Sequence, residues 1–279
     1  MVMTGTFIRQ IMRKRFLPYA RLPLASCCMK PTFLILGAQK SGTTSLIRLL
    51  AQHPDILPPV THQEVHYFDM QYHRGYAWYK SNFPLCRRGR IAGEKSPYYL
   101  YHPLVPERVA EYNENMRLIV LLRDPVKRAY SHYQMMKRWG FETRPFRAAI
   151  DEEMENVESE HLRLARGDIE NSLVHQRYSY LARGRYVEQL DRWMKYFPRE
   201  RFYIETAERF ARETQTICLE IFRFLDLPPA DITRIKRYNA YHYDPMLEED
   251  QRYLAEYFRP FNTRLADSYG IDISGWTSP

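Results

Sequence analysis

The chain has 279 residues, of which 45% are hydrophobic, enough for one large domain with a substantial core. Forty-one Lys and Arg against 33 Asp and Glu give a formal charge of +8, which suits anionic ligands such as nucleotides, sulfated glycans, nucleic acid or lipid headgroups. No window approaches the roughly 20 apolar residues that cross a bilayer, so no transmembrane segment is expected.

The first 31 residues contain no Asp or Glu and several Arg and Lys. We expect a basic N-terminal extension over 1–31, either a frayed tail, a weak transit segment or a peripheral membrane contact, followed by one domain over 32–279. The cysteines are Cys27, Cys28, Cys86 and Cys218. None has the C-x-x-C spacing of a zinc or redox site, and the absence of a disulfide framework favours a reducing, cytoplasmic location. The oligomeric state stays unknown at this stage.

Two continuous apolar runs predict buried strands. Phe33–Leu36 ends at Gly37, and Leu118–Leu122 ends before Pro125. Runs that are apolar on both faces are typical of a parallel sheet. A helix is expected after each run, from about residue 43 to 52 and from Pro125, where proline suits a first helical turn. Two strand–loop–helix units predict an α/β fold.

Further along, the patterns predict helices over 144–183, 186–196, 213–225 and 248–257, and a strand over 201–204. Six acidic residues in the first of these helices are expected on a solvated face: Asp151, Glu152, Glu153, Glu155, Glu158 and Glu160. No repeat or linker indicates a second domain.

The segment between the first strand and its helix, residues 37–45, predicts an anion site. Free backbone N–H groups at a helix N-terminus, with the positive end of the helix dipole, hold phosphate. The segment supplies small residues and further donors at Lys40, Ser41, Gly42, Thr43, Thr44 and Ser45. The lysine precedes the second glycine, whereas in a Walker A loop it follows, which argues against ATP or GTP hydrolysis. An incidental turn is the alternative.

The chain resembles a known family in several segments. FLILGAQKSGTTSL resembles the 5′-phosphosulfate-binding loop of sulfotransferases that use 3′-phosphoadenosine 5′-phosphosulfate (PAPS), and RLIVLLRDPVKRAYSHY resembles their 3′-phosphate-binding segment. HQEVHYFD, GYAWYKSNFP and GEKSPYYL look like the heparan sulfate and glycosaminoglycan branch and its bacterial relatives. The similarity extends over residues 32–276. It implies a single domain with a P-loop-like parallel sheet flanked by helices on both faces, PAPS as donor and no metal.

The resemblance also implies roles for individual residues. Lys40 matches the family lysine at the leaving 5′-phosphate, and Lys95 matches a second lysine near the transferring group; a surface salt bridge is the alternative for Lys95. Arg123 and Ser131 match the residues that hold the 3′-phosphate, and Arg supplies two donors to one phosphate. Arg128 has no assigned role and reads equally as a helix-surface charge.

Glu64, in EVHYFD, occupies the position of the general base in heparan-type enzymes, whereas cytosolic small-molecule sulfotransferases use a histidine. In an extended segment His66 lies on the same face, so it orients the acceptor, shares the proton transfer, or is itself the base. A structural role for both is a further reading. His62 on that face raises a metal site as a rival, although no fourth ligand is evident.

Two more features bear on the ligands. Lys236 and Arg237 correspond to a basic loop that closes over the nucleotide phosphates in the family, although the expected glycine and flanking cysteines are absent, which weakens the case for heparan sulfate itself. Trp78 and Tyr79 either stack on a sugar or base or belong to the core.

The leading hypothesis is a cytoplasmic enzyme that sulfates a hydroxyl, or less readily an amine, of a saccharide or glycolipid. Alternatives are sulfation of a lipid, polyketide or phenol, a non-catalytic nucleotide-binding module, and a P-loop kinase. A nucleic-acid partner is not expected, because no ribonucleoprotein or helix-turn-helix motif is present. A glycan acceptor predicts lost turnover on charge reversal at Arg74, Lys80, Arg87 or Arg88.

Overall fold

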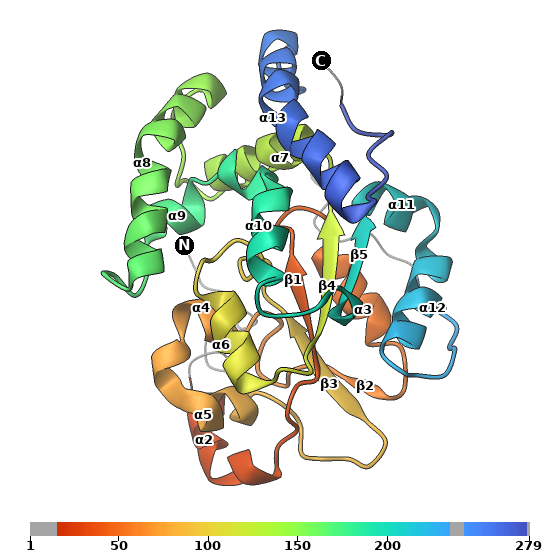
Figure 1. The fold of residues 1–279 in the computed structure, drawn as a ribbon. Helices are drawn as coiled ribbons and strands as arrows, with labels where there is room; N and C mark the ends of the chain where they lie inside the picture. The colour runs from red at the N-terminus through yellow and green to blue at the C-terminus, as the bar shows by residue number, and fades with distance from the viewer. Residues whose placement is uncertain (1–15, 235–242, 278–279) are drawn as a thin grey trace, which may run out of the picture.

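The computed structural model describes residues 16–234 and 243–277, and its centre is a five-stranded, all-parallel sheet of order β2-β3-β1-β4-β5 (Figure 1). The strands are β1 (Phe33–Gly37), β2 (Ile56–Leu57), β3 (Ile91–Lys95), β4 (Arg117–Leu122) and β5 (Phe202–Thr206). The predicted strands at β1, β4 and β5 are confirmed within two residues, and the predicted α/β class is correct.

Helices cover both faces of the sheet, as the family resemblance implies (Figure 1). On one face Phe33 and Ile35 pack against α3 (Thr43–Leu50) and α12 (Thr214–Phe224). On the other, Leu34 and Leu36 pack against α6 (Val105–Tyr112) and α10 (Tyr186–Trp193). Alternate residues of one strand face opposite sides, so both faces need apolar cover, which explains the continuous apolar runs.

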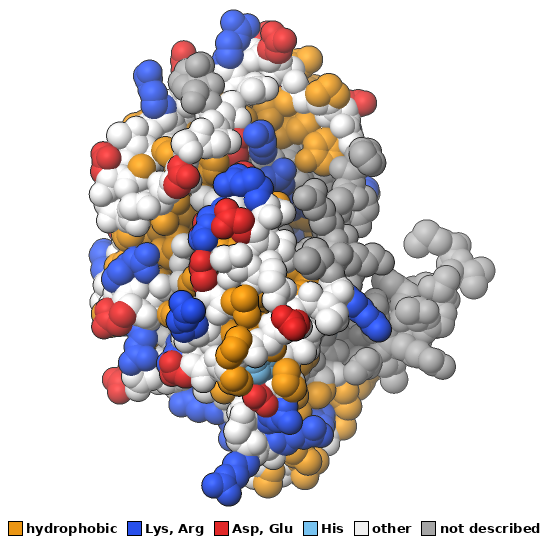
Figure 2. Space-filling view, turned by 90° about the vertical axis from the view of Figure 1, so that its right-hand side faces the viewer, with side chains coloured by type: hydrophobic (Ala, Val, Ile, Leu, Met, Phe, Trp, Pro, Cys, Tyr) orange, Lys and Arg blue, Asp and Glu red, His pale blue; other side chains and the backbone are white. Residues whose placement is uncertain are grey.

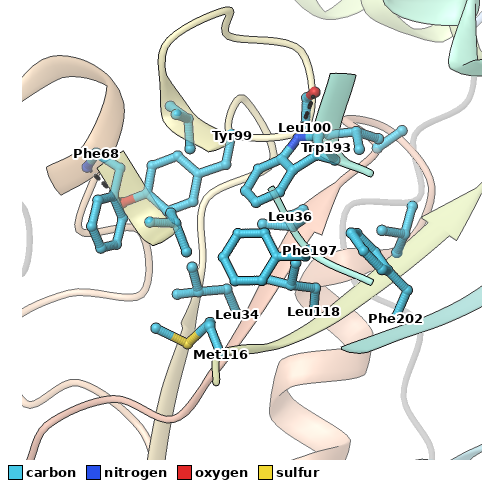
Figure 3. Packing of buried hydrophobic residues seen from close by; sticks show 14 of the residues in the cluster. Leu34, Leu36, Phe68, Tyr99, Leu100, Met116, Leu118, Trp193, Phe197 and Phe202 are labelled. Carbon is cyan, nitrogen blue, oxygen red and sulfur yellow. Dashed lines mark hydrogen bonds between the residues drawn. The ribbon is translucent and has the colours of Figure 1, made fainter. Parts of the chain in front are cut away.

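The core on the α10 face is dense (Figure 3). Leu34, Leu118 and Phe197 pack beneath Trp193, whose indole Nε1 donates a 3.1 Å hydrogen bond to the carbonyl oxygen of Leu100. Burial of each such side chain contributes about 1.5–3 kcal/mol. This packing fixes the loop after β3, which carries Leu100, against the sheet.

A second group of helices lies beyond the carboxyl ends of the strands (Figure 1). It comprises α7 (Pro125–Arg138), α8 (Phe146–Arg166), α9 (Leu173–Arg177) and α13 (Glu248–Tyr269). The helix expected over 144–183 is interrupted, because the chain leaves α8 at Gly167, whose φ of 77° favours glycine.

One residue of the acidic run in α8 is buried, contrary to the expected solvated face. Glu153 is 4% exposed and lies on the inward stripe of α8 with Ile150 and Val157. Its carboxylate accepts hydrogen bonds from the backbone N–H groups of Leu181 and Ala182, at 2.6 and 2.8 Å. Burial raises the pKa of Glu153 to about 7, although these N–H groups oppose the shift. Glu153 therefore ties α8 to the segment before α10.

The remaining elements are short and lie mostly around the N-terminal half. They are α2 (Leu17–Ala20), η1 (Leu22–Cys27), α4 (Tyr67–Met70), η2 (Tyr72–Arg74), α5 (Gly75–Ser81), η3 (Ala182–Gly184), η4 (Arg199–Arg201) and α11 (Ala207–Arg212). The described part of the N-terminal extension packs on α5, where Arg21 donates to the carbonyl oxygens of Ser81 and Phe83. The boundary at 31/32 stays a prediction.

Charges of both signs are interspersed on the face that carries α11 and α12 (Figure 2). The net charge of +8 is therefore not gathered into one patch there. Within 16–234 and 243–277, no helix is long and apolar enough to cross a bilayer.

Candidate active site

The carboxyl ends of β1, β3 and β4 carry the residues that the sequence singled out. Connections leave β1 and β4 in opposite directions along the sheet, which is the point where open α/β sheets bind ligands. Lys40 follows β1, Lys95 ends β3 and Arg123 follows β4. Arg123 Nη1 donates a 2.9 Å hydrogen bond to the carbonyl oxygen of Lys40, which joins two of these loops directly.

The loop between β1 and α3 has the backbone of an anion site. Gly42 is the N-cap of α3 with φ of 91°, a left-handed conformation that favours glycine. Thr43 and Thr44 form the first turn, whose N–H groups have no acceptor within the helix. The Ser41 hydroxyl is buried and has no hydrogen-bond partner among the described residues. These unused donors fit an anionic group at the N-terminus of α3.

Lys40 lies in this loop among other cations. Its Nζ is 3.9 Å from Met135 Sδ on α7. Burial and repulsion by Arg138, Arg123 and Arg128 lower the pKa of Lys40 to about 8. Because these positive charges converge, a bound anion relieves their repulsion.

Two residues of α7 complete this part of the site. Ser131 is buried on the helix that starts just after Arg123, and the Asp124 side chain caps that helix by accepting from the N–H groups of Val126 and Lys127. Arg128 is wholly buried, not a surface charge, and its Nη2 donates to the carbonyl oxygen of Tyr180. Its Nε and Nη1 have no partner among the described residues.

Glu64, His66 and Lys95 form one hydrogen-bonded cluster. Glu64 Oε1 contacts Lys95 Nζ, and Glu64 Oε2 is 3.3 Å from His66 Nε2. The other ring nitrogen of His66, Nδ1, is 2.8 Å from Asp69 Oδ2. The segment is not extended at His66, whose φ is 53°, yet the side chains of Glu64 and His66 still meet.

The contacts within the cluster shift the pKa values of Glu64 and His66 in favour of their charged forms. Burial opposes ionisation of Glu64, but His66 and Lys95 outweigh it and lower the pKa of Glu64 to about 2. Burial likewise disfavours the imidazolium, but Asp69 and Glu64 outweigh it and raise the pKa of His66 to about 10. At neutral pH Glu64 is therefore a carboxylate and His66 an imidazolium, and the two groups titrate as a coupled pair.

Comparison of the sequence with known proteins identifies the family. The profile of the sulfotransferase domain matches residues 30–253. The chain belongs to the sulfotransferase family. It is 31% identical to the mouse heparan sulfate glucosamine 3-O-sulfotransferase 5 over 76% of this chain, but spans only 56% of that relative. It is 30% identical to the human 3-O-sulfotransferase 6, covering 91% of this chain and 77% of the relative.

The fold agrees with that of a solved bacterial member of the family. A sulfotransferase from Alicyclobacillus acidocaldarius is 28% identical and superposes with a TM-score of 0.74, covering 89% of this chain and 99% of that one. The family and fold inferred from the sequence motifs are thereby confirmed.

Two residues of this sulfotransferase site were not singled out from the sequence. Asp69 holds His66, and it lies three residues further along the quoted HQEVHYFD segment, which is the signal that was overlooked. Glu94 is wholly buried beside Lys95 and accepts hydrogen bonds from the Val65 N–H, at 3.0 Å, and the Tyr99 hydroxyl, at 2.8 Å. Glu94 fixes the backbone next to Glu64, and burial raises the pKa of Glu94.

Other expectations for this sulfotransferase have different outcomes. Lys236 and Arg237 lie outside the described residues, so their contact with phosphate stays a prediction. Trp78 and Tyr79 are both buried in the core, which decides between the two readings offered for them. Within the described ranges no three His, Cys, Asp or Glu side chains form a group that fits a metal ion.

The four basic residues expected at the acceptor lie in two different places. Arg87 and Arg88 lie in the loop that leads into β3, so they are at the amino edge of the sheet, opposite the site. Arg74 stacks on an indole ring of α5, and Lys80 Nζ donates to a backbone carbonyl of η1. Arg87 and Arg88 are therefore poor candidates for acceptor contacts, whereas the loss of turnover on charge reversal at Arg74 or Lys80 stays a prediction.

Proposed function

We propose that this chain transfers the sulfuryl group of PAPS to a hydroxyl, or less readily an amine, of a saccharide or glycolipid and releases adenosine 3′,5′-bisphosphate (PAP). The observation that carries the proposal is the convergence of an anion loop, two lysines and a carboxylate–histidine pair at one edge of the sheet. Sulfuryl transfer needs these three kinds of group within reach of one sulfur atom.

The donor binds along the loop and α7 in this proposal. The N–H groups of Thr43 and Thr44, the Ser41 hydroxyl and Lys40 hold the 5′-phosphosulfate, and Arg123 with Ser131 holds the 3′-phosphate. Two observations support this placement: the hydrogen-bond donors without acceptors and the repulsion among the cations. A polyanion accepts from the donors and relieves the repulsion.

In the chemical step the acceptor oxygen forms a bond to sulfur, and its proton passes to Glu64. The bond between sulfur and the bridging oxygen breaks, and its electron pair stays on the phosphate, where Lys40 neutralises the charge. Glu64 is a weak base while His66 and Lys95 occupy its two carboxylate oxygens, since together they lower the pKa of Glu64 to about 2. The mechanism therefore requires the Lys95–Glu64 pair to separate, which raises this pKa and frees Lys95 for the leaving phosphate.

His66 orients Glu64 in this scheme. Asp69 contacts Nδ1 of the His66 ring and keeps the ring charged. Nε2 of His66 therefore donates toward Glu64 and is poorly suited to accept a proton. This supports Glu64, rather than His66, as the base.

The saccharide class of the acceptor rests on the relatives, whose names specify heparan sulfate glucosamine. Sulfation of a lipid, polyketide or phenol is the alternative, because acceptor loops vary within one fold. A non-catalytic nucleotide-binding module is a further alternative that predicts PAP binding without turnover. The cytoplasmic location inferred from the cysteines stays a prediction, which fractionation of cells expressing the tagged full chain tests.

The first experiment is isothermal titration of the full chain with PAP and with 5′-AMP. We expect micromolar or tighter binding of PAP, much weaker binding of AMP, and loss of this difference in Arg123→Ala. Turnover is then followed as PAP release from PAPS with a saccharide panel and with phenol and lipid alcohols. Equal binding of PAP and AMP by the wild type contradicts the donor site, and PAP binding without transfer to any acceptor contradicts the enzymatic proposal.

A further inference from the structure

Exposed aromatic side chains gather where the C-terminal end of α7 meets α9. Trp139 is 55% exposed and Phe141 is 42% exposed, and their ring centroids are 6.5 Å apart in an edge-to-face arrangement. The Arg177 guanidinium lies 3.9 Å from the centroid of the Phe141 ring. We call Trp139, Phe141 and Arg177 the aromatic platform. Large aromatic side chains exposed together need an explanation, because isolated ones are normal but clusters mark binding surfaces.

Contacts connect the platform to both halves of the candidate active site. On the donor side, the backbone N–H of Trp139 donates a 3.1 Å hydrogen bond to the carbonyl oxygen of Met135. The Sδ atom of Met135 is 3.9 Å from Lys40 Nζ. Trp139 thus lies one helical turn, about 6 Å, beyond the residue that touches Lys40. The preceding residue, Arg138, is one of the charges that repel Lys40.

The path on the acceptor side starts at His66, which is bonded to Asp69. The next residue, Met70, has its Sδ 2.9 Å from Gln176 Nε2, and Arg177 follows Gln176 in α9. Short contacts therefore run from the proposed base through α4 and α9 to the platform, and from the platform through α7 to Lys40. The platform therefore lies on the two elements, α7 and α9, that contact the candidate active site through Met135 and Gln176.

The chemistry of the platform fits a ligand with apolar ring faces and negative charge. Indole and phenyl faces pack against the C–H faces of pyranose rings, and guanidinium binds sulfate or carboxylate through two donors. No carboxylate lies within ion-pair distance of Arg177 among the described residues, so its charge is not neutralised by the protein. Lys137 and Arg138, both exposed beside Trp139, add to the positive potential.

We propose that the aromatic platform binds the acceptor as an anionic saccharide, with Trp139 and Phe141 packed on sugar rings and Arg177 on a sulfate or carboxylate of the same chain. This inference rests on the proposed function and assigns a place and a charge to the acceptor. A neutral phenol or lipid alcohol uses the apolar surface and leaves Arg177 without a ligand.

The test is binding of a fluorescent, N-sulfated, uronate-containing octasaccharide to the full chain saturated with PAP, measured by anisotropy. A neutral glucan octasaccharide is the comparison probe. Trp139→Ala, Phe141→Ala and Arg177→Gln each weaken binding of the sulfated probe about tenfold, as expected for loss of one stacking or charge-assisted contact. Tyr196→Ala, at a residue also 42% exposed, and Arg88→Gln, at the amino edge of the sheet, leave it unchanged.

PAP affinity, measured for every variant, shows that the donor site is intact and separates this inference from the proposed function. Selective loss of the sulfated probe in the platform variants, with weaker salt dependence in Arg177→Gln, supports the inference. Equal binding of the sulfated and neutral probes overturns it. So does unchanged affinity for the sulfated probe in the platform variants, or failure of the sulfated probe to bind a chain that binds PAP. Failure of PAP itself to bind contradicts the proposed donor site instead.

Discussion

The pH dependence of PAP binding tests the electrostatics around Lys40, whose pKa is lowered from 10.5 to about 8. Burial removes water from the ammonium group, and Arg138, Arg123 and Arg128 repel it, so the ligand-free protein destabilises the charged form relative to the neutral amine. A polyanion beside Lys40 favours the charged form and returns the pKa toward its ordinary value.

Proton linkage gives the sign and size of the effect. Below pH 8 Lys40 is protonated with and without PAP, so this group leaves the affinity independent of pH. Above pH 8 binding must add a proton, and the affinity falls by up to about tenfold per pH unit until the pKa of the bound state is reached. With that pKa at about 10.5, the affinity at about pH 9.5 is roughly thirtyfold below its value at neutral pH. The phosphates of PAP do not titrate in this window, since their second pKa is about 6.

Isothermal titration at constant ionic strength, in buffers of different ionisation enthalpy, measures both the affinity and the protons taken up. Lys40→Arg is the matched control, because guanidinium stays charged throughout this range and its affinity should stay constant. A wild-type affinity that does not change between neutral pH and about pH 9.5 refutes a lowered pKa for Lys40 or its contact with the phosphates.

Three further predictions concern the acid–base cluster and the sheet. Glu64→Gln lowers kcat by about 10²–10⁴-fold with the PAP dissociation constant within about twofold of wild type; unchanged kcat in steady-state assays assigns the base elsewhere. Glu94→Gln replaces a carboxylate oxygen that accepts from the Val65 N–H or the Tyr99 hydroxyl, so kcat should fall about tenfold or more while PAP binding persists. Equal loss of kcat and of PAP binding indicates misfolding instead. Gly93→Ala places a Cβ 2.4 Å from the Phe33 ring and should lower the free energy of unfolding by about 1–3 kcal/mol in urea titrations, whereas Gly275→Ala, with open space around it, should be neutral.

Local sequence signals were sufficient for part of the molecule. The runs that form β1 and β4 were predictable because four or five consecutive apolar residues suit a strand buried on both faces. The anion loop was predictable because glycine and hydroxyl residues stand between a strand and a helix. By contrast β3, with the sequence IAGEK, has weak strand propensity, and it forms because Gly93 pairs opposite Phe33 in the central strand.

Periodicity explains one error in the reading of α8. The density of acidic residues there predicted a solvated face, but Glu153 lies at helical spacing from Ile150 and Val157 on the buried stripe. A count of helical spacing identifies Glu153 as an inward position. It does not identify the two backbone N–H groups that satisfy the carboxylate, because they come from residues 28 and 29 positions away.

The sequence by itself determined the family, the α/β class and the identity of the candidate residues, since these depend on residue types at fixed spacing along the chain. Only the tertiary structure decided that Lys95 meets Glu64 across 31 positions, that burial and three arginines lower the pKa of Lys40, and that Met135 of α7 lies beside Lys40. The physical reason is that proximity, burial and mutual repulsion arise when the sheet brings separate loops to one edge, and no local pattern records which of those side chains then touch.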